Sequence, residues 1–180
     1  FMKDVLIWVP VIGLAWGALD MPFLKRYSEE KIKRNPELRG KDISSMKKSF
    51  TRFSRYPVSI FIFAEGTRFT KEKKDLQSSP FNNLLLPKPG GIGLTLSTMP
   101  YINKMIDFSI KYESDKKTFW AFLCGEMNEA IVKVNLIDIP QKLLGGDYSE
   151  DEIYRDDLKN WLYDIWQEKD KFLSSQERRD

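Results

Sequence analysis

The most chemically suggestive stretch of the sequence is Phe63-Ala64-Glu65-Gly66-Thr67-Arg68-Phe69, which follows an apolar run. Arg68 can offer a planar fork of donors to the oxygens of a phosphate monoester, and Thr67 adds a hydroxyl. Gly66 permits a backbone conformation or a close approach that a side chain would prevent. Glu65 can hold the arginine in place or bind a substrate hydroxyl. A phosphate site fits these residues, and so does a plain glycine turn after a strand, with Glu65 and Arg68 paired at the surface.

The pattern Phe-x-Glu-Gly-Thr-Arg resembles the third sequence block of the glycerolipid acyltransferases. The resemblance implies that Glu65, Gly66, Thr67 and Arg68 bind the phosphate of the acyl acceptor. The proline that usually precedes the glutamate is Ala64 here, a change that leaves the polar groups in place. The resemblance extends over nearly the whole chain and is closest to a branch of membrane acyltransferases with a long basic segment after the second block.

Two further matches to the family are weaker. The stretch 23–26, Phe-Leu-Lys-Arg, resembles the second block, although Asp20 stands where that block has glycine. This match implies that Arg26 lies at the phosphate or acyl-donor site, while an exposed arginine at a strand end is the alternative. The stretch 86–91 opens a predicted helix, whose start could place backbone N–H groups and Lys88 near an anion. A flexible junction before a helix is the better explanation of its glycines.

The catalytic block of the family, His-x-x-x-x-Asp, is missing, because the chain contains no histidine. In that block the histidine takes the proton from the acceptor hydroxyl and the aspartate orients the ring. Cys124 has no imidazole to activate it as a nucleophile. We therefore expect a fragment that lacks the N-terminal part of an acyltransferase and is itself inactive. With no histidine and one cysteine, a structural zinc site is also excluded.

The net charge of +3 hides an asymmetry along the chain. Residues 1–104 contain 18 basic and 9 acidic residues, whereas residues 105–180 contain 11 and 17. The stretch 25–55 alone carries 11 basic and 4 acidic residues. Such a segment could meet anionic lipid headgroups, a phosphorylated substrate or coenzyme A, although a solvated helix face explains most individual lysines. Nucleic acid is disfavoured as a partner because no recognised binding module accompanies the charge.

An almost continuous apolar segment, residues 5–24, is near the length that spans a bilayer, but prolines and glycines interrupt it. We expect a buried helix over 10–19 rather than a transmembrane helix. Trp8 and Trp16 would also suit a helix that rests at the membrane interface. With the basic stretch, this segment predicts attachment to an anionic membrane on its cytoplasmic face, the bacterial inner membrane being our expectation.

The order of predicted elements indicates an α/β domain. We expect strands at 21–25, 58–63, 106–112 and 131–137 and a helix between Asp42 and Pro57. A long loop should cover 70–88. Residues 86–91 should open a helix that runs through Met99, and a short turn or helix should follow over 118–125. The last helix should begin with the capping box Ser149-Glu150-Asp151-Glu152. Its expected apolar face consists of Ile153, Leu158, Trp161, Leu162, Ile165 and Trp166.

With the resemblance, this order predicts a mixed, largely parallel sheet flanked by helices. Residues 1–180 would form a single acyltransferase-like domain, the C-terminal portion of a larger one. The resemblance further implies acyl transfer from acyl-CoA or acyl carrier protein to a lysophospholipid such as 1-acylglycerol-3-phosphate, with no metal or other cofactor. Two alternatives stay open. One is a non-catalytic lipid-binding or membrane-associated scaffold protein. The other is an unrelated enzyme that uses Glu65 as an acid–base group, which requires a second carboxylate beside it.

Overall fold

The computed structural model describes residues 59–112, 114, 118–127, 129–148 and 150–175. The chain divides after Ile62 into two compact units. The described helices and strands all lie in the second unit. The predicted helices at 10–19 and 42–56, the predicted strand at 21–25, the segment 5–24 and Arg26 all lie outside the described residues.

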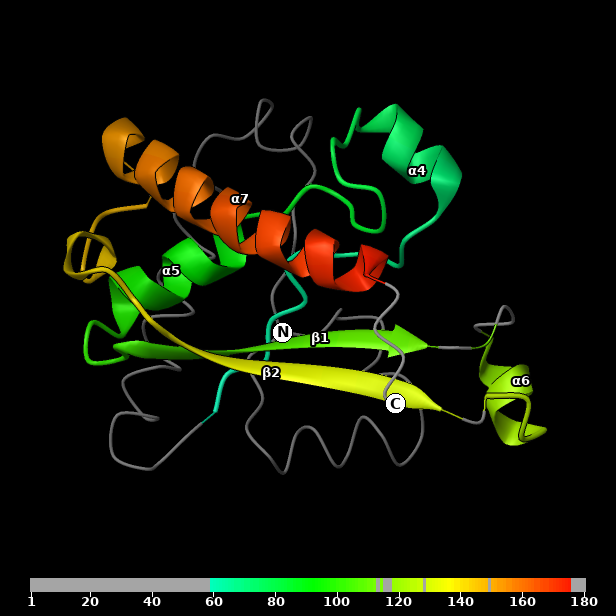
Figure 1. The fold of residues 1–180 in the computed structure, drawn as a ribbon. Helices are drawn as coiled ribbons and strands as arrows, with labels where there is room; N and C mark the ends of the chain where they lie inside the picture. The colour runs from blue at the N-terminus through cyan, green and yellow to red at the C-terminus, as the bar shows by residue number, and fades with distance from the viewer. Residues whose placement is uncertain (1–58, 113, 115–117, 128, 149, 176–180) are drawn as a thin grey trace, which may run out of the picture. The chain divides into compact units, whose positions relative to one another are not determined.

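The described residues of the second unit form four α-helices and two strands. In chain order they are α4 (Lys71–Leu76), α5 (Gly90–Thr98), β1 (Lys104–Tyr112), α6 (Phe119–Leu123), β2 (Ala130–Asp138) and α7 (Glu152–Ser174), with a 3-10 helix at Gln141–Leu143 before α7. Figure 1 shows α7 running along one side of the β1–β2 hairpin and α6 at the far end of the hairpin, where it joins the two strands.

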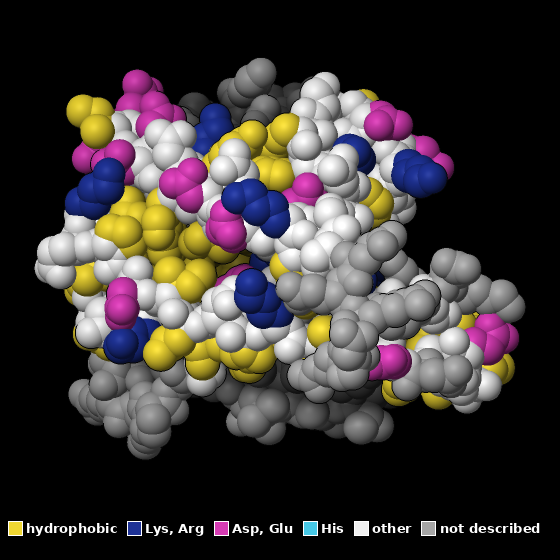
Figure 2. Space-filling view, in the orientation of Figure 1, with side chains coloured by type: hydrophobic (Ala, Val, Ile, Leu, Met, Phe, Trp, Pro, Cys, Tyr) yellow, Lys and Arg dark blue, Asp and Glu magenta, His cyan; other side chains and the backbone are white. Residues whose placement is uncertain are grey.

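The β1–β2 hairpin presents two faces of opposite character. The strands are antiparallel, with Lys104 opposite Asp138 and Tyr112 opposite Ala130. Asp107 and Ser109 lie buried on the face toward α7, whose Lys169 contacts Asp107. The face away from α7 carries large apolar side chains that remain exposed. Figure 2 shows hydrophobic side chains along the hairpin on this side. They are Ile106, Phe108, Ile110, Val132, Val134 and Leu136.

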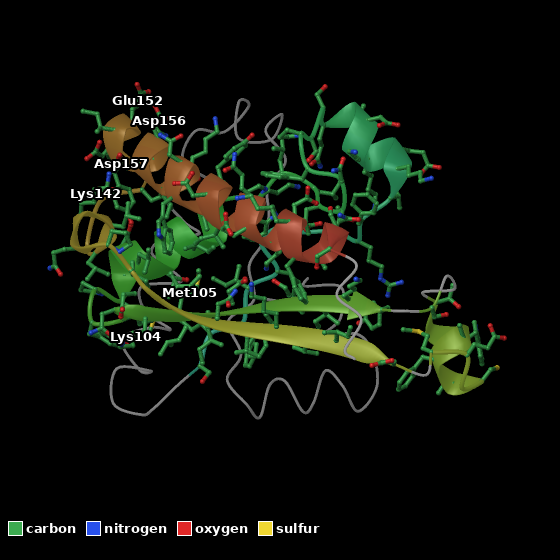
Figure 3. The ribbon with its side chains drawn as sticks, in the orientation of Figure 1. Lys104, Met105, Lys142, Glu152, Asp156 and Asp157 are labelled. Carbon is green, nitrogen blue, oxygen red and sulfur yellow. The ribbon has the colours of Figure 1, made fainter. Side chains whose placement is uncertain are left out.

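Helix α7 supplies the longest buried stripe of the unit. Asp151 caps its start by accepting a hydrogen bond from the backbone N–H of Tyr154. A side chain buried at every fourth position then keeps one face of the helix against the 3-10 helix and β1. These side chains are Tyr154, Leu158, Leu162 and Trp166. Near the start of α7, Asp157 pairs with Lys142 of the 3-10 helix at 2.8 Å (Figure 3).

Close packing of α5 depends on a glycine. A Cβ atom at Gly93 would lie 2.2 Å from the ring of Tyr148, which is closer than atoms can approach. Further along α5, Leu96 is almost fully buried, and Met99 follows it into the core. The glycine therefore lets the segment before α7 lie directly on the helix that follows Lys88.

Several predicted elements are confirmed, with small shifts of their ends. The strands predicted at 106–112 and 131–137 are β1 and β2, the helix predicted to open at 86–91 and run through Met99 is α5, and the turn or helix predicted at 118–125 is α6. The structure contains both helices and a sheet, and its two described strands pair antiparallel. None of the described helices has the length and apolar character needed to cross a membrane.

Four predictions were wrong. Residues 59–63 are not a strand, because this β-prone run pairs with no other strand within the described residues. The stretch 70–88 is not all loop, because Thr70 caps α4 by accepting from the N–H of Lys73. Ile153 is 78% exposed, since the neighbouring Tyr154 occupies the buried stripe instead. The predicted capping box was wrong as well, because Asp151 is the N-cap of α7 and Ser149, the predicted cap, lies outside the described residues.

Candidate functional site

The Glu65–Arg68 block forms a tight turn. The N–H of Gly66 donates to the carbonyl oxygen of Phe63 at 2.9 Å, and Gly66 has a φ of +69°. This left-handed conformation is costly for a residue with a Cβ atom, so glycine is the natural residue here. The predicted glycine turn is present, with Glu65 just before the glycine and Thr67 and Arg68 just after it.

Glu65 is directed into the protein rather than toward Arg68. The backbone N–H of Leu85 and the ammonium group of Lys169 on α7 both lie close enough to the Glu65 carboxylate to favour its ionised form. Burial nevertheless dominates and raises the pKa of the half-buried Glu65 carboxyl above its usual value. Within the described part of the chain, Glu65 and Arg68 form no ion pair, so the interpretation as a surface pair does not hold.

The side chain of Arg68 is exposed. The turn that carries it is held by hydrogen bonds from Lys73, a residue that the sequence did not single out. Lys73 Nζ donates to Thr67 Oγ1 at 2.8 Å and to the carbonyl oxygen of Arg68 at 3.2 Å. Thr70, as the N-cap of α4, could have signalled this arrangement, because a cap there starts a helix whose first turn brings Lys73 back toward the turn. Three basic residues therefore lie on or directly beside the turn: Arg68, Lys73 and Lys88.

Lys88 lies beside the same turn through its backbone. Its N–H donates to the carbonyl oxygen of Ala64 at 2.7 Å, and its side chain is exposed. Helix α5 begins two residues later, so its first N–H groups lack intrahelical acceptors close to this point. The structure therefore brings the Glu65–Arg68 turn and the Lys88 segment together, as a shared phosphate site requires.

The described residues give less support to a metal site or to acid–base catalysis by a pair of carboxylates. They contain no group of three or more side chains of the kinds that usually ligate metals. A second carboxylate, Asp107, shares Lys169 with Glu65. However, Asp107 is buried and bonded to that lysine, so it is poorly suited to exchange protons with a substrate. Cys124 is free and exposed.

Comparisons with known proteins point in one direction. The chain is 26% identical over 182 residues to the human 1-acyl-sn-glycerol-3-phosphate acyltransferase delta and 28% identical to its mouse counterpart. It is 23% identical over 215 residues to a yeast 2-acyl-1-lysophosphatidylinositol acyltransferase. These alignments cover 94–96% of the chain but only 43% of the two mammalian proteins and 52% of the yeast protein. No family model matches the sequence, and no solved structure gives a significant match.

Proposed function

We propose that this chain, a relative of the glycerolipid acyltransferases, forms the acceptor-binding part of an enzyme that acylates a lysophospholipid. The acceptor would be 1-acylglycerol-3-phosphate or a close analogue, and the donor acyl-CoA or acyl carrier protein. The observation that carries the proposal is the turn that exposes Arg68 beside the Lys88 segment. The relatives' names support the substrate class, since both are acyltransferases of lysophospholipids.

Chemically, the described residues are suited to binding and orientation. Arg68 would grip two phosphate oxygens through its guanidinium fork, and Lys88 would add a second positive charge. Glu65, half-buried beside the Leu85 backbone, would hold the turn in place instead of touching the acceptor. A general base must still take the proton from the acceptor hydroxyl. Because these 180 residues include no histidine, we propose that the base comes from sequence outside them and that the isolated chain is inactive.

The fold and location follow as parts of the same proposal. The exposed apolar face of the hairpin is suited to a further layer packed against it. We propose that the whole domain contains a mixed, mainly parallel sheet flanked by helices. We propose that Arg26 joins the phosphate or acyl-donor site. The basic stretch 25–55, with the apolar segment 5–24, would attach the protein to the cytoplasmic face of an anionic membrane.

Arg68 provides the direct test of acceptor binding. In the full-length protein, Arg68→Lys should raise the KM for 1-acylglycerol-3-phosphate, because an ammonium cannot reproduce the fork. Arg68→Ala should raise it further, by roughly tenfold to hundredfold, the range for a lost charge-assisted contact. Lys159→Ala, which removes an exposed charge from α7, serves as the matched control.

The outcome separates the enzyme from its main alternative. Unchanged acceptor kinetics in both Arg68 variants would remove this residue from the site. A full-length protein that binds lysophosphatidate vesicles but transfers no acyl group would favour the non-catalytic lipid-binding protein. Turnover by the 180-residue chain alone would contradict the proposed external base.

A further inference from the structure

The last turns of α7 hold a segment that is far away in sequence. Asp170 accepts the backbone N–H of Asn82 on one carboxylate oxygen at 2.8 Å and that of Asn83 on the other at 2.7 Å. The side-chain amide of Asn83 donates to Asp170 at 3.2 Å and to Ser174 at 2.8 Å. A single carboxylate thus fixes two consecutive peptide groups from 87 and 88 residues away.

Side-chain packing also holds residues 81–83 against α7. Phe81, the residue before this pair, is only 3% exposed, and its ring lies 5.0 Å from that of Tyr163 on α7. The hydroxyl of Ser79 donates to the carbonyl oxygen of Leu84 at 2.8 Å, which closes the loop on itself. The segment from Ser79 to Leu84 is therefore an ordered bridge that ends on helix α7.

The bridge continues directly into the candidate site. Leu85, which is fully buried, places its backbone N–H close enough to the Glu65 carboxylate to favour the ionised form. Three residues later, the N–H of Lys88 donates to the carbonyl oxygen of Ala64 at 2.7 Å. Only one residue, Leu84, separates Asn83 from the amide of Leu85 that lies beside Glu65. A displacement at Asn83 would therefore reach both backbone contacts that fasten the Glu65–Arg68 turn.

We propose that Asp170 is a positioning residue for the phosphate site, acting through the 82–88 segment on the Glu65–Arg68 turn and on Lys88. This inference rests on the proposed function. The carboxylate suits the task because its two oxygens can accept two adjacent N–H groups at once. Asparagine offers one oxygen and would turn its own amide toward the other N–H. Asp170→Asn therefore changes the hydrogen bonding with almost no change in size or shape.

The test combines a structural and a kinetic measurement on the full-length protein. In Asp170→Asn, hydrogen exchange at the amides of Asn83, Leu85 and Lys88 should be at least severalfold faster than in the wild type. The KM for 1-acylglycerol-3-phosphate should rise about tenfold or more, with a smaller change in kcat, because a misplaced binding group weakens acceptor capture. Asp157→Asn is the matched control, since it removes an α7 carboxylate whose partner, Lys142, lies away from the turn.

A milder variant keeps the test usable if Asp170→Asn folds poorly. Asn83→Ala removes the side-chain bonds to Asp170 and Ser174 and leaves both backbone bonds. It should produce the same changes at a smaller magnitude. Asp170→Glu, which keeps both oxygens, should recover part of the exchange protection and part of the acceptor KM.

Each outcome has a definite meaning. Faster exchange together with a higher acceptor KM, both absent from Asp157→Asn, supports the proposal. Unchanged exchange overturns it, and so does faster exchange with an unchanged KM when Arg68→Ala raises the KM, a result that leaves the proposed function intact. If Arg68→Ala leaves the KM unchanged as well, the proposed function fails, and the positioning role fails with it.

Discussion

The two halves of α7 each carry a lysine–aspartate pair, and the pairs differ sharply in burial. At the N-terminal half, Asp157 meets Lys142 at 2.8 Å, with the aspartate side chain 38% and the lysine side chain 61% exposed (Figure 3). At the C-terminal half, Lys169 meets Asp107 at 2.5 Å with side chains only 11% and 9% exposed. Water screens the first pair and is nearly excluded from the second. The lysine–aspartate pair is therefore weak at the N-terminal end of α7. At the C-terminal end, each buried charge needs its partner to stay compensated.

Burial also gives the second pair more partners. Lys169 Nζ donates to the carbonyl oxygen of Phe108 at 3.3 Å and lies 4.7 Å from the centre of a Trp166 ring. It further favours the ionised form of Glu65 in the candidate site. Since the Asp170 contacts begin at the next residue, the C-terminal half of α7 supports the site, whereas the N-terminal half mainly packs the core.

Removing the buried lysine should have the largest effect on stability. Lys169→Met leaves Asp107 as an unpaired charge in the interior, a change that typically costs about 3–5 kcal/mol. We expect the free energy of unfolding, measured in urea on the full chain, to fall by an amount in that range. The m-value should stay unchanged if unfolding remains two-state.

The double variant sharpens this expectation. Replacing both partners, Asp107→Val with Lys169→Met, removes the buried charge as well as its counter-ion. Such replacements are often neutral, so the double variant should be clearly more stable than Lys169→Met alone. A double variant as unstable as the single one would show that packing around Lys169, rather than its charge, matters at this end of α7.

Glu65 extends the comparison to pH. Burial raises the pKa of its carboxyl, so the folded state binds this proton more tightly than the unfolded state. Stability must then fall as pH rises through the window between the usual glutamate pKa and the raised one. Glu65→Gln cannot ionise, so this part of the decline should disappear. Subtracting the two curves of unfolding free energy between pH 4 and 7 isolates the effect, and parallel curves would contradict it.

The sequence predicted what short-range patterns determine. The strand patterns located β1 and β2 to within a few residues, and the glycine in the Glu65–Arg68 block indicated a turn or a close approach, of which the structure shows a turn. Each of these features depends on neighbouring residues, so the local order of side chains is sufficient information.

The remaining features depend on contacts that no local pattern encodes. Asp170 looks like any polar residue on an exposed helix face, and its role is visible only when residues 82–83 are placed against it. Alternation in β1 likewise shows that its two faces differ. It does not show that the polar face, with Asp107, packs on α7. Burial of a polar face requires a partner such as Lys169, which lies 62 residues away.

The smallest effect should come from the exposed pair of α7, and it completes the comparison. Lys142→Met removes a partner that Asp157 can replace with water, so we expect a loss of at most about 1 kcal/mol. Salt should erase even this difference, because screening weakens exposed pairs, whereas the loss in Lys169→Met should persist at high salt. Urea unfolding of both variants at low and high ionic strength measures the contrast directly. A salt-resistant loss of several kcal/mol in Lys142→Met would mean that the exposed pair is as essential as the buried one, and burial would then not be what separates the two halves of the helix.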